Sequence, residues 1–299
     1  MPAAVALLTS FDLALYAITV FVWSTSWIAL ALQVGDTPAE VSAFWRFAVS
    51  AVLMVGWVVL SGRSMRFSWR THLRLLAMGA TLFSSNFLMF YYGAHYLTSG
   101  LLAVVFSLAS VTNMLFAAVM LGQRIEARVA LGALVGFCGV GLMFLPEIAG
   151  EQLDRSALIG LAYCVAGTLC FSYGNVLAAG AQRSGVPVLP ATAWGMVYGA
   201  AFLGLFAALR GFSFAIPMDV TYLNALAWLA VFSSVVAFAC YLTLLGRIGA
   251  ARAGYSTVMF PVAALTISTV FEGYQWTWPA ALGLVLALGG NLLVLRRRA

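Results

Sequence analysis

Charge is scarce in this chain of 299 residues. Only 8% of the residues are Asp, Glu, Lys or Arg, whereas soluble globular domains carry about 25%. Hydrophobic residues make up 64% of the chain, and the mean hydropathy is +1.02. So few charges cannot provide the polar surface of a soluble fold. The composition therefore predicts an all-α polytopic membrane protein in contact with a lipid bilayer.

Lysine is absent, and all 15 basic residues are arginines. They lie between apolar runs and do not gather into one basic surface. Proteins that bind nucleic acid usually concentrate Lys and Arg on one face. We therefore expect no nucleic-acid partner.

Groups that could hold a metal or perform catalysis are few. The only histidines are His72 and His95, and the four cysteines lie inside apolar runs without metal-binding spacing. An intramembrane enzyme would need a metal cluster or an activated nucleophile with its base. The sequence therefore predicts no enzyme, no catalytic residue, no metal and no cofactor.

Carboxylates are missing from the centres of the predicted helices, although the chain contains nine of them. Proton- or sodium-coupled carriers often place ionisable groups at that depth. This absence favours a facilitator or a weakly coupled exporter. Asp12 and Glu272, near the ends of predicted helices, remain candidates for coupling.

Apolar runs divide the chain into segments long enough to span a bilayer, which takes roughly 20 residues. The charges and loop signals between these runs predict ten transmembrane helices, at 12–32, 41–61, 73–95, 99–120, 127–146, 157–181, 188–210, 221–245, 252–271 and 279–296. No basic segment precedes the first run, so we interpret that run as a retained helix and not as a signal peptide. The loops are too short for a soluble domain.

The arginines are unevenly distributed between alternate loops. With a cytoplasmic N-terminus, the inward loops and tail hold Arg63, Arg66, Arg70, Arg74, Arg124, Arg128, Arg183, Arg247, Arg252, Arg296, Arg297 and Arg298. The outward loops hold only Arg155 and Arg210. Cytoplasmic loops of membrane proteins carry an excess of basic residues. Both termini are therefore predicted to be cytoplasmic, in a bacterial cytoplasmic (inner) membrane.

The two halves of the chain resemble one another. Gly132 and Gly139 recur 151 residues later as Gly283 and Gly290, and Ser84 recurs 150 residues later as Ser234. The repeats would cover residues 1–150 and 151–299 and contain five helices each. Because five is an odd number, the second repeat must enter the membrane from the side opposite to the first. The sequence thus predicts two inverted five-helix repeats forming one transport domain, as in many secondary transporters.

The motifs also resemble a known family. FWRFAVSAVLM (Phe44–Met54) is similar to the Arg-containing second helix of the EamA-type drug/metabolite transporter (DMT) superfamily. The run Ser99–Val140 is similar to the fourth and fifth helices of that family, and MFPVAALTISTVFEG (Met259–Gly273) to their counterpart with a proline and a glutamate. Within it the chain most resembles the YddG-type aromatic amino-acid exporters. That resemblance implies export of aromatic amino acids. The first half departs from the pattern with Ser110 at the usual proline and Gly122–Gln123 at the usual Gly-Glu.

Polar and aromatic residues recur at helical spacing inside several apolar segments. Polar side chains avoid lipid, so such stripes should face protein or water. Serines can instead bond to their own helix, and aromatic residues near helix ends can anchor in headgroups. The candidate substrate-binding residues are Trp23, Trp27, Ser84, Ser85, Tyr91, Tyr92, Phe106, Ser110, Ser172, Asn175, Ser234 and Tyr241.

Two further residues are assigned gating or structural roles. Pro261 lies inside the ninth predicted helix, and Arg46 lies about one turn into the second. Arg46 could attract a substrate carboxylate, or it could have a structural role in which it snorkels to the interface or bonds helix-end carbonyls. The structural role is favoured. Glycines spaced four apart in the fifth and seventh helices predict close helix packing within a monomer, with a homodimer as the alternative.

These observations predict a membrane transporter that exports small amphipathic metabolites by alternating access between the inverted repeats. Aromatic and hydroxyl side chains suit a substrate with an apolar body and a few hydrogen-bonding groups. Aromatic or other neutral amino acids are the expected substrates, mainly through the resemblance. The alternatives are an exporter or facilitator of another metabolite or drug class and, disfavoured, an intramembrane enzyme.

Overall fold

The structure is a computed structural model that describes residues 9–122, 127–145, 155–248 and 256–295. The described residues form helices joined by short turns and loops, and they contain no strand. Parts of the predicted fifth, ninth and tenth helices, at 146, 252–255 and 296, lie outside the described residues, as do Arg124, Arg252 and Arg296–Arg298.

The helices follow the apolar runs to within a few residues. The predicted third and eighth helices are each a continuous rod in which a π-helical segment separates two α-helices. The predicted fourth helix is interrupted at Leu108, between α5 and α6. The helices are α1 (Ser10–Ala31), α2 (Ala39–Leu60), α3 (Trp69–Ala80), η1 (Thr81–Ser85), α4 (Asn86–Gly93), α5 (Ser99–Ser107), α6 (Ala109–Leu121), α7 (Ala127–Met143), α9 (Arg155–Arg183), α10 (Val188–Leu209), α11 (Val220–Ala227), η2 (Trp228–Val236), α12 (Ala237–Ile248), α14 (Ser256–Phe271) and α15 (Trp278–Leu295).

Seven helical rods are long and apolar enough to cross a membrane, and three shorter apolar helices accompany them within the described residues. Large apolar side chains cover the outside of the bundle, with Leu60 90% and Trp278 89% exposed. Polar and charged side chains such as Gln33, Glu40 and Arg46 are buried inside. This inverted distribution of polarity is that of a multi-pass integral membrane protein.

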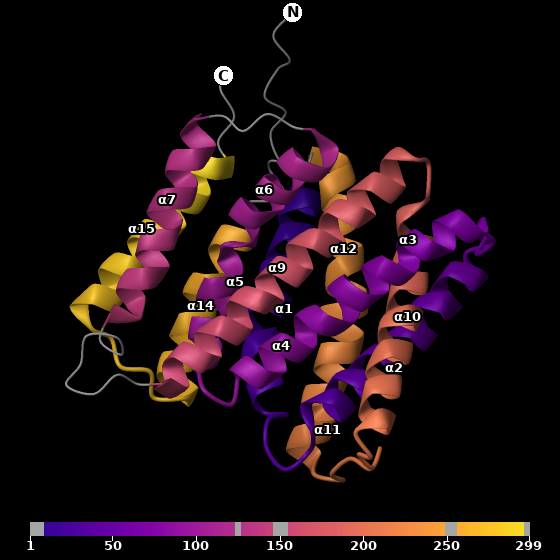
Figure 1. Cartoon of the computed structure of the whole chain (residues 1–299), viewed down its shortest axis with the longest axis horizontal. Helices are drawn as coiled ribbons and strands as arrows, with labels where there is room; N and C mark the ends of the chain where they lie inside the picture. The colour runs from indigo at the N-terminus through magenta and orange to yellow at the C-terminus, as the bar shows by residue number, and fades with distance from the viewer. Residues whose placement is uncertain (1–8, 123–126, 146–154, 249–255, 296–299) are drawn as a thin grey trace, which may run out of the picture.

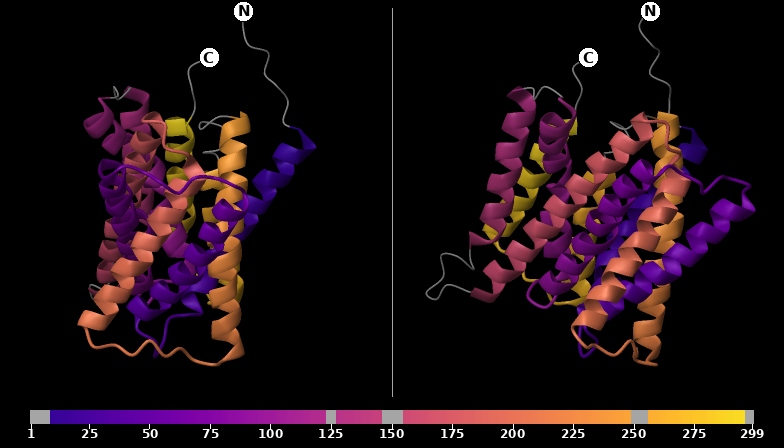
Figure 2. Two further views of the ribbon diagram at one scale, coloured as in Figure 1. Left: turned by 90° about the vertical axis from the view of Figure 1, so that its right-hand side faces the viewer. Right: turned by 45° about the vertical axis from the view of Figure 1, so that its right-hand side comes forward.

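The helices form one bundle in which they run side by side at moderate tilts (Figures 1 and 2). The pair α7 and α15 forms one edge, α2, α3 and α10 form the other, and α1, α4 and α5 lie between them. The first residues of α1 and the last residues of α15 lie toward the same end of the bundle (Figure 1). Helices from both halves of the chain therefore surround the centre.

The contact between α7 and α15 depends on glycine. A Cβ atom built on Gly290 would lie 2.5 Å from the carbonyl oxygen of Gly132 and 2.5 Å from the nitrogen of Gly136. One on Gly139 would lie 2.6 Å from the carbonyl oxygen of Gly283. The repeated glycines thus allow the two backbones to touch, so the fifth and tenth predicted helices use these faces within the chain.

Glycine has a similar role in α10. A Cβ on Gly199 would lie 2.6 Å from the carbonyl oxygen of Phe83, and one on Gly195 would lie 2.5 Å from Cε of Met78. The predicted close packing of the seventh helix is therefore present, against α3 and η1.

The helix ends repeat as well. Gly62 follows α2 with φ of 67° and Gly211 follows α10 with φ of 73°; Gly122 ends α6 with φ of 65° and Gly273 follows α14 with φ of 69°. Left-handed backbone at these positions favours glycine, which ends a helix without steric cost. Corresponding helices of the two halves are therefore terminated in the same way.

Both halves also carry a π-helical segment in the corresponding rod, η1 in the first and η2 in the second. Ser84 lies in η1 and Ser234 in η2, and both are buried. The Ser234 hydroxyl donates to the carbonyl oxygen of Leu229, five residues earlier, at 2.9 Å. Such segments widen the helix and are frequent at functional sites. They therefore direct attention to the centre of the bundle.

Candidate functional site

Aromatic side chains from both halves of the chain meet in the middle of the bundle. Phe106 of α5 is the centre of this group, with ring centroids 5.3 Å from Trp27, 4.6 Å from Phe171 and 6.0 Å from Phe260. Most of these rings meet edge to face or tilted, which is the favoured geometry. We call the group the aromatic cluster; its members are Trp23, Trp27, Phe90, Phe106, Phe171, Phe238, Tyr241 and Phe260.

Arg46 lies beside the cluster, about 10 Å along α2 from its first residue. Its side chain is 3% exposed. Nε donates to the hydroxyl of Ser234 and Nη2 donates to the hydroxyl of Ser233, both at 3.3 Å. The guanidinium lies over the ring of Phe87, 4.3 Å from its centroid. Within the described residues Arg46 forms no ion pair.

The π-helical segment η2 connects Arg46 to the aromatic cluster. The hydroxyl of Ser233 accepts from Arg46, while its backbone carbonyl oxygen accepts a hydrogen bond from the indole N–H of Trp23 at 3.3 Å. Tyr91 of α4 lies next to the guanidinium and donates to Oε1 of Gln33 at 2.5 Å. The amide nitrogen of Gln33 is buried without a hydrogen-bond partner. A single buried charge, hydrogen-bonding groups and aromatic rings therefore adjoin at the centre.

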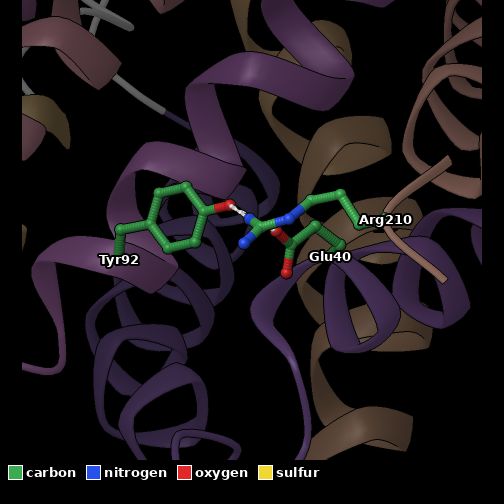
Figure 3. A network of polar contacts seen from close by, with 3 residues as sticks. All are labelled: Glu40, Tyr92 and Arg210. Atoms are coloured by element: carbon green, nitrogen blue, oxygen red, sulfur yellow. Dashed lines mark hydrogen bonds and ion pairs between the residues drawn. The ribbon is translucent and has the colours of Figure 1, made fainter. Parts of the chain in front are cut away.

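A second polar group lies at the end of the bundle where α2 begins (Figure 3). Nη1 of Arg210, after α10, donates to Oε1 of Glu40 at 2.7 Å, and the Tyr92 hydroxyl donates to the same oxygen at 2.5 Å. Glu40 is 2% exposed, whereas Arg210 is 49% exposed. We call these three residues the Glu40–Arg210–Tyr92 network. It joins α2 and α4 of the first half to α10 of the second.

The two carboxylates considered for ion coupling act as helix caps. Glu272, after α14, accepts from the backbone N–H of Ser99 at 3.0 Å and from its hydroxyl at 2.5 Å, at the first residue of α5. Asp12 forms a capping box with Thr9 at the start of α1. Carboxylates at helix N-termini are stabilised by free backbone N–H groups and by the helix dipole. Both therefore have a structural function that the sequence alone did not indicate.

Comparison with known proteins identifies the kind of protein that contains this arrangement. The EamA-like transporter family matches the chain twice, over residues 11–145 and 150–296. The chain belongs to the EamA-like transporter family. The two matches agree with two repeats, and membership indicates a transporter rather than an enzyme. The expected membership of the EamA/DMT superfamily is thus confirmed.

Relatives of this EamA-family chain span almost its whole length. An "Uncharacterized transporter" of Archaeoglobus fulgidus is 24% identical, covering 94% of this chain and 98% of its own. Protein PagO of Salmonella typhimurium is 21% identical over 95% and 92% of the two chains. A solved crystal structure covers 94% of the chain with a TM-score of 0.68 at 18% identity. That likeness shows that the fold is shared.

The structure separates the candidate residues of this EamA-family chain into groups. The aromatic cluster contains four of them, Trp23, Trp27, Phe106 and Tyr241. Pro261 is buried next to Phe260, another member of the cluster, in α14. Ser234 and Tyr91 lie next to Arg46, and Tyr92 belongs to the Glu40–Arg210–Tyr92 network. Ser84 and Ser85 lie in η1, buried and half-buried.

The remaining candidates link helices to one another. Ser110 of α6 donates to the amide oxygen of Asn291 in α15, and Ser172 of α9 shares a hydrogen bond of 2.5 Å with Thr112 of α6. Asn175 donates to Asn113 at 3.4 Å. Such contacts join helices in a membrane. These three residues lie in helix contacts of α6, outside the aromatic cluster.

Several residues of the site did not emerge from the sequence. The cluster also contains Phe90, Phe171, Phe238 and Phe260. A phenylalanine in an apolar run has no pattern that separates a substrate contact from a packed core or a lipid-facing surface. The arginine bias placed Arg210 in an outward loop, and its partner Glu40 is 170 residues away. Only the fold brings this pair together.

Proposed function

We propose that the protein exports small amphipathic metabolites, foremost aromatic or other neutral amino acids, by alternating access between two inverted repeats. The observation that carries this proposal is the aromatic cluster, to which helices of both halves contribute: α1, α4 and α5 from the first, and α9, α12 and α14 from the second. A site shared between repeats can be exposed to either side by movement of one half against the other.

The proposed arrangement has ten membrane crossings. The three shorter helices α7, α14 and α15 have 17, 16 and 18 residues. They would span roughly 24–27 Å, close to the hydrocarbon thickness of about 30 Å. The arginine distribution supports cytoplasmic termini and a bacterial inner membrane. The glycine contact between α7 and α15 supports a monomer, because it occupies the faces that a homodimer would need.

Accessibility of single cysteines tests the orientation. Arg66, between α2 and α3, is exposed, and Met218, between α10 and α11, is 84% exposed. In intact cells, a membrane-impermeant maleimide should label Met218→Cys and should label Arg66→Cys only after the membrane is opened. The reverse pattern would invert the topology, and labelling of both from outside would contradict the ten crossings.

Transport into and out of liposomes tests the function. Purified protein should give time-dependent efflux of labelled tryptophan or phenylalanine that empty liposomes lack. Phe106→Leu removes the ring that contacts four others in the cluster. An aromatic contact contributes about 0.5–1.5 kcal/mol, so the apparent affinity for an aromatic substrate should fall by up to about 10-fold.

Phe202→Leu is the matched control, because Phe202 lies in α10 with a 43% exposed side chain. Its affinity should equal that of the unmodified protein. Equal kinetics in both variants would remove the aromatic cluster from the pathway. Efflux of other compounds without efflux of amino acids would favour the alternative, a carrier of another metabolite or drug class. Conversion of a substrate without flux would favour an intramembrane enzyme.

A further inference from the structure

Arg46 is a buried cation that has no acidic partner among the described residues. Its hydrogen-bond partners, Ser233 and Ser234, are neutral hydroxyls, and Phe87 offers only the face of its ring. Gln33 and Tyr91, the other polar groups nearby, are neutral amide and phenol. Buried charges in proteins are normally paired, because an unpaired one loses its hydration without return. The part of the site that the structure describes thus lacks an anion.

We infer that Arg46 binds the carboxylate of the transported molecule, so that the substrate must be an anion-bearing metabolite. This inference rests on the proposed function, since it names the charged group of the same substrate. A planar guanidinium presents a fork of N–H donors that matches a carboxylate, and it stays protonated in an apolar interior. A single monovalent cation between hydroxyls and rings fits a monoanion better than a divalent phosphate.

The surroundings of Arg46 place an apolar body next to that carboxylate. A continuous series of ring contacts runs from Phe87 through Phe47 and Phe83 to Phe238, with centroid distances of 4.8, 6.0 and 5.9 Å. Phe238 contacts Trp23 at 5.7 Å, inside the aromatic cluster. Trp23 is also bonded to Ser233, which accepts from Arg46. One molecule with a carboxylate and an aromatic or aliphatic body could therefore contact both parts.

The charge of the site has a consequence for selectivity. A substrate that has lost its carboxylate would bring only an ammonium group toward the Arg46 guanidinium, and like charges repel. Decarboxylated amines should therefore be excluded, although their apolar bodies fit equally well. A carboxylic acid without an amino group should still bind.

Six ligands distinguish the contribution of the carboxylate to binding from the contribution of the apolar body. Binding to the purified protein in detergent is measured for tryptophan, indole-3-propionate and tryptamine, and for leucine, 4-methylpentanoate and 3-methylbutylamine. Loss of one partner from a buried charge pair weakens binding by about 30-fold or more. In each series, the amino acid and the carboxylic acid without an amino group should therefore bind at least about 30-fold more tightly than the amine.

Arg46→Gln should remove this difference, and Arg46→Lys should retain part of it because the charge remains. Arg183→Gln is the matched control, because Arg183 is exposed at the end of α9, and it should bind all six ligands as the unmodified protein does. Melting temperatures without ligand show whether each variant folds. If Arg46→Gln does not fold, the ligand series on the unmodified protein decides the question.

Amine binding as tight as that of the matching carboxylates, or an unchanged preference in folded Arg46→Gln, would overturn the inference. No carboxylate preference in either series would overturn it as well. A carboxylate preference confined to the leucine series would support Arg46 as the anion site while it refutes the aromatic substrate class. Failure of this inference and failure of the proposed function are thus distinguishable.

Discussion

Gly290→Ala is expected to lower the melting temperature of the purified protein by several degrees, whereas Gly289→Ala leaves it nearly unchanged. The two glycines are adjacent in α15, but only Gly290 meets another backbone. A Cβ atom on Gly290 would lie 2.5 Å from the carbonyl oxygen of Gly132. No atom of the described residues lies within 4 Å of a Cβ on Gly289. The alanine methyl at 290 must therefore push α15 away from α7.

Forcing an extra carbon into a packed contact costs typically 1–3 kcal/mol, and the clash here is with backbone, which cannot rotate away. A loss of about 2–3 kcal/mol corresponds to roughly 4–12 °C. At Gly289 the better helix propensity of alanine would give a small gain. Thermal unfolding in detergent measures both variants. Equal melting temperatures would show that the two helices can separate without cost.

Much of the fold could be predicted from the sequence because the bilayer imposes it. The thickness of the membrane fixes the length of each apolar run, and the predicted bounds agree with the described helices to within a few residues. The spacing of Gly132 and Gly139 against Gly283 and Gly290 indicated a repeat, and these glycines now meet one another in α7 and α15. The π-helical segments were not predicted, because serine and apolar residues in η1 and η2 suit an α-helix equally well.

Less of the site could be predicted. Stripes of serine and tyrosine led to Ser234 and Tyr91, which lie beside Arg46. The same reasoning selected Ser110, which bonds to Asn291 in another helix. A hydroxyl that joins helices and a hydroxyl that faces a substrate have the same spacing in the sequence. The sequence of an apolar helix also does not indicate which face packs against protein and which faces lipid. Residues all round such a helix are hydrophobic, so no polar face marks the protein-facing side.

The Glu40–Arg210–Tyr92 network is the strongest candidate for a contact that breaks in the proposed alternating-access cycle. It connects the two halves of the chain at the end of the bundle that we propose to face outward (Figure 3). Its acceptor is one oxygen of a buried carboxylate that accepts from both Arg210 and Tyr92. Alternating access moves one repeat against the other, and an ion pair between the repeats can hold one side closed. We expect this network to stabilise the outward-closed state.

Glu40→Gln should therefore increase outward opening. Hydrogen bonds to a charged group contribute about 1.5–3 kcal/mol. Arg210 is half-exposed and solvent screens its charge, so we expect the contribution of the network to lie toward the lower end of this range. The opening equilibrium should rise by roughly 10-fold to 100-fold. A cysteine at Ser84, which is buried in η1, reports this opening through its rate of labelling by an impermeant maleimide from outside.

Asp36→Asn is the matched control, because Asp36 is an exposed carboxylate in the turn before α2 and should leave the labelling rate unchanged. Arg210→Gln should act in the same direction as Glu40→Gln. If the two residues form one closing contact, the double variant should open little more than either single variant, because the second change removes an interaction that is already lost. Additive effects would mean that each residue stabilises the closed state separately. Unchanged labelling in all three variants would make the network a fixed anchor between helices and would assign closure of the pathway to the aromatic side chains alone.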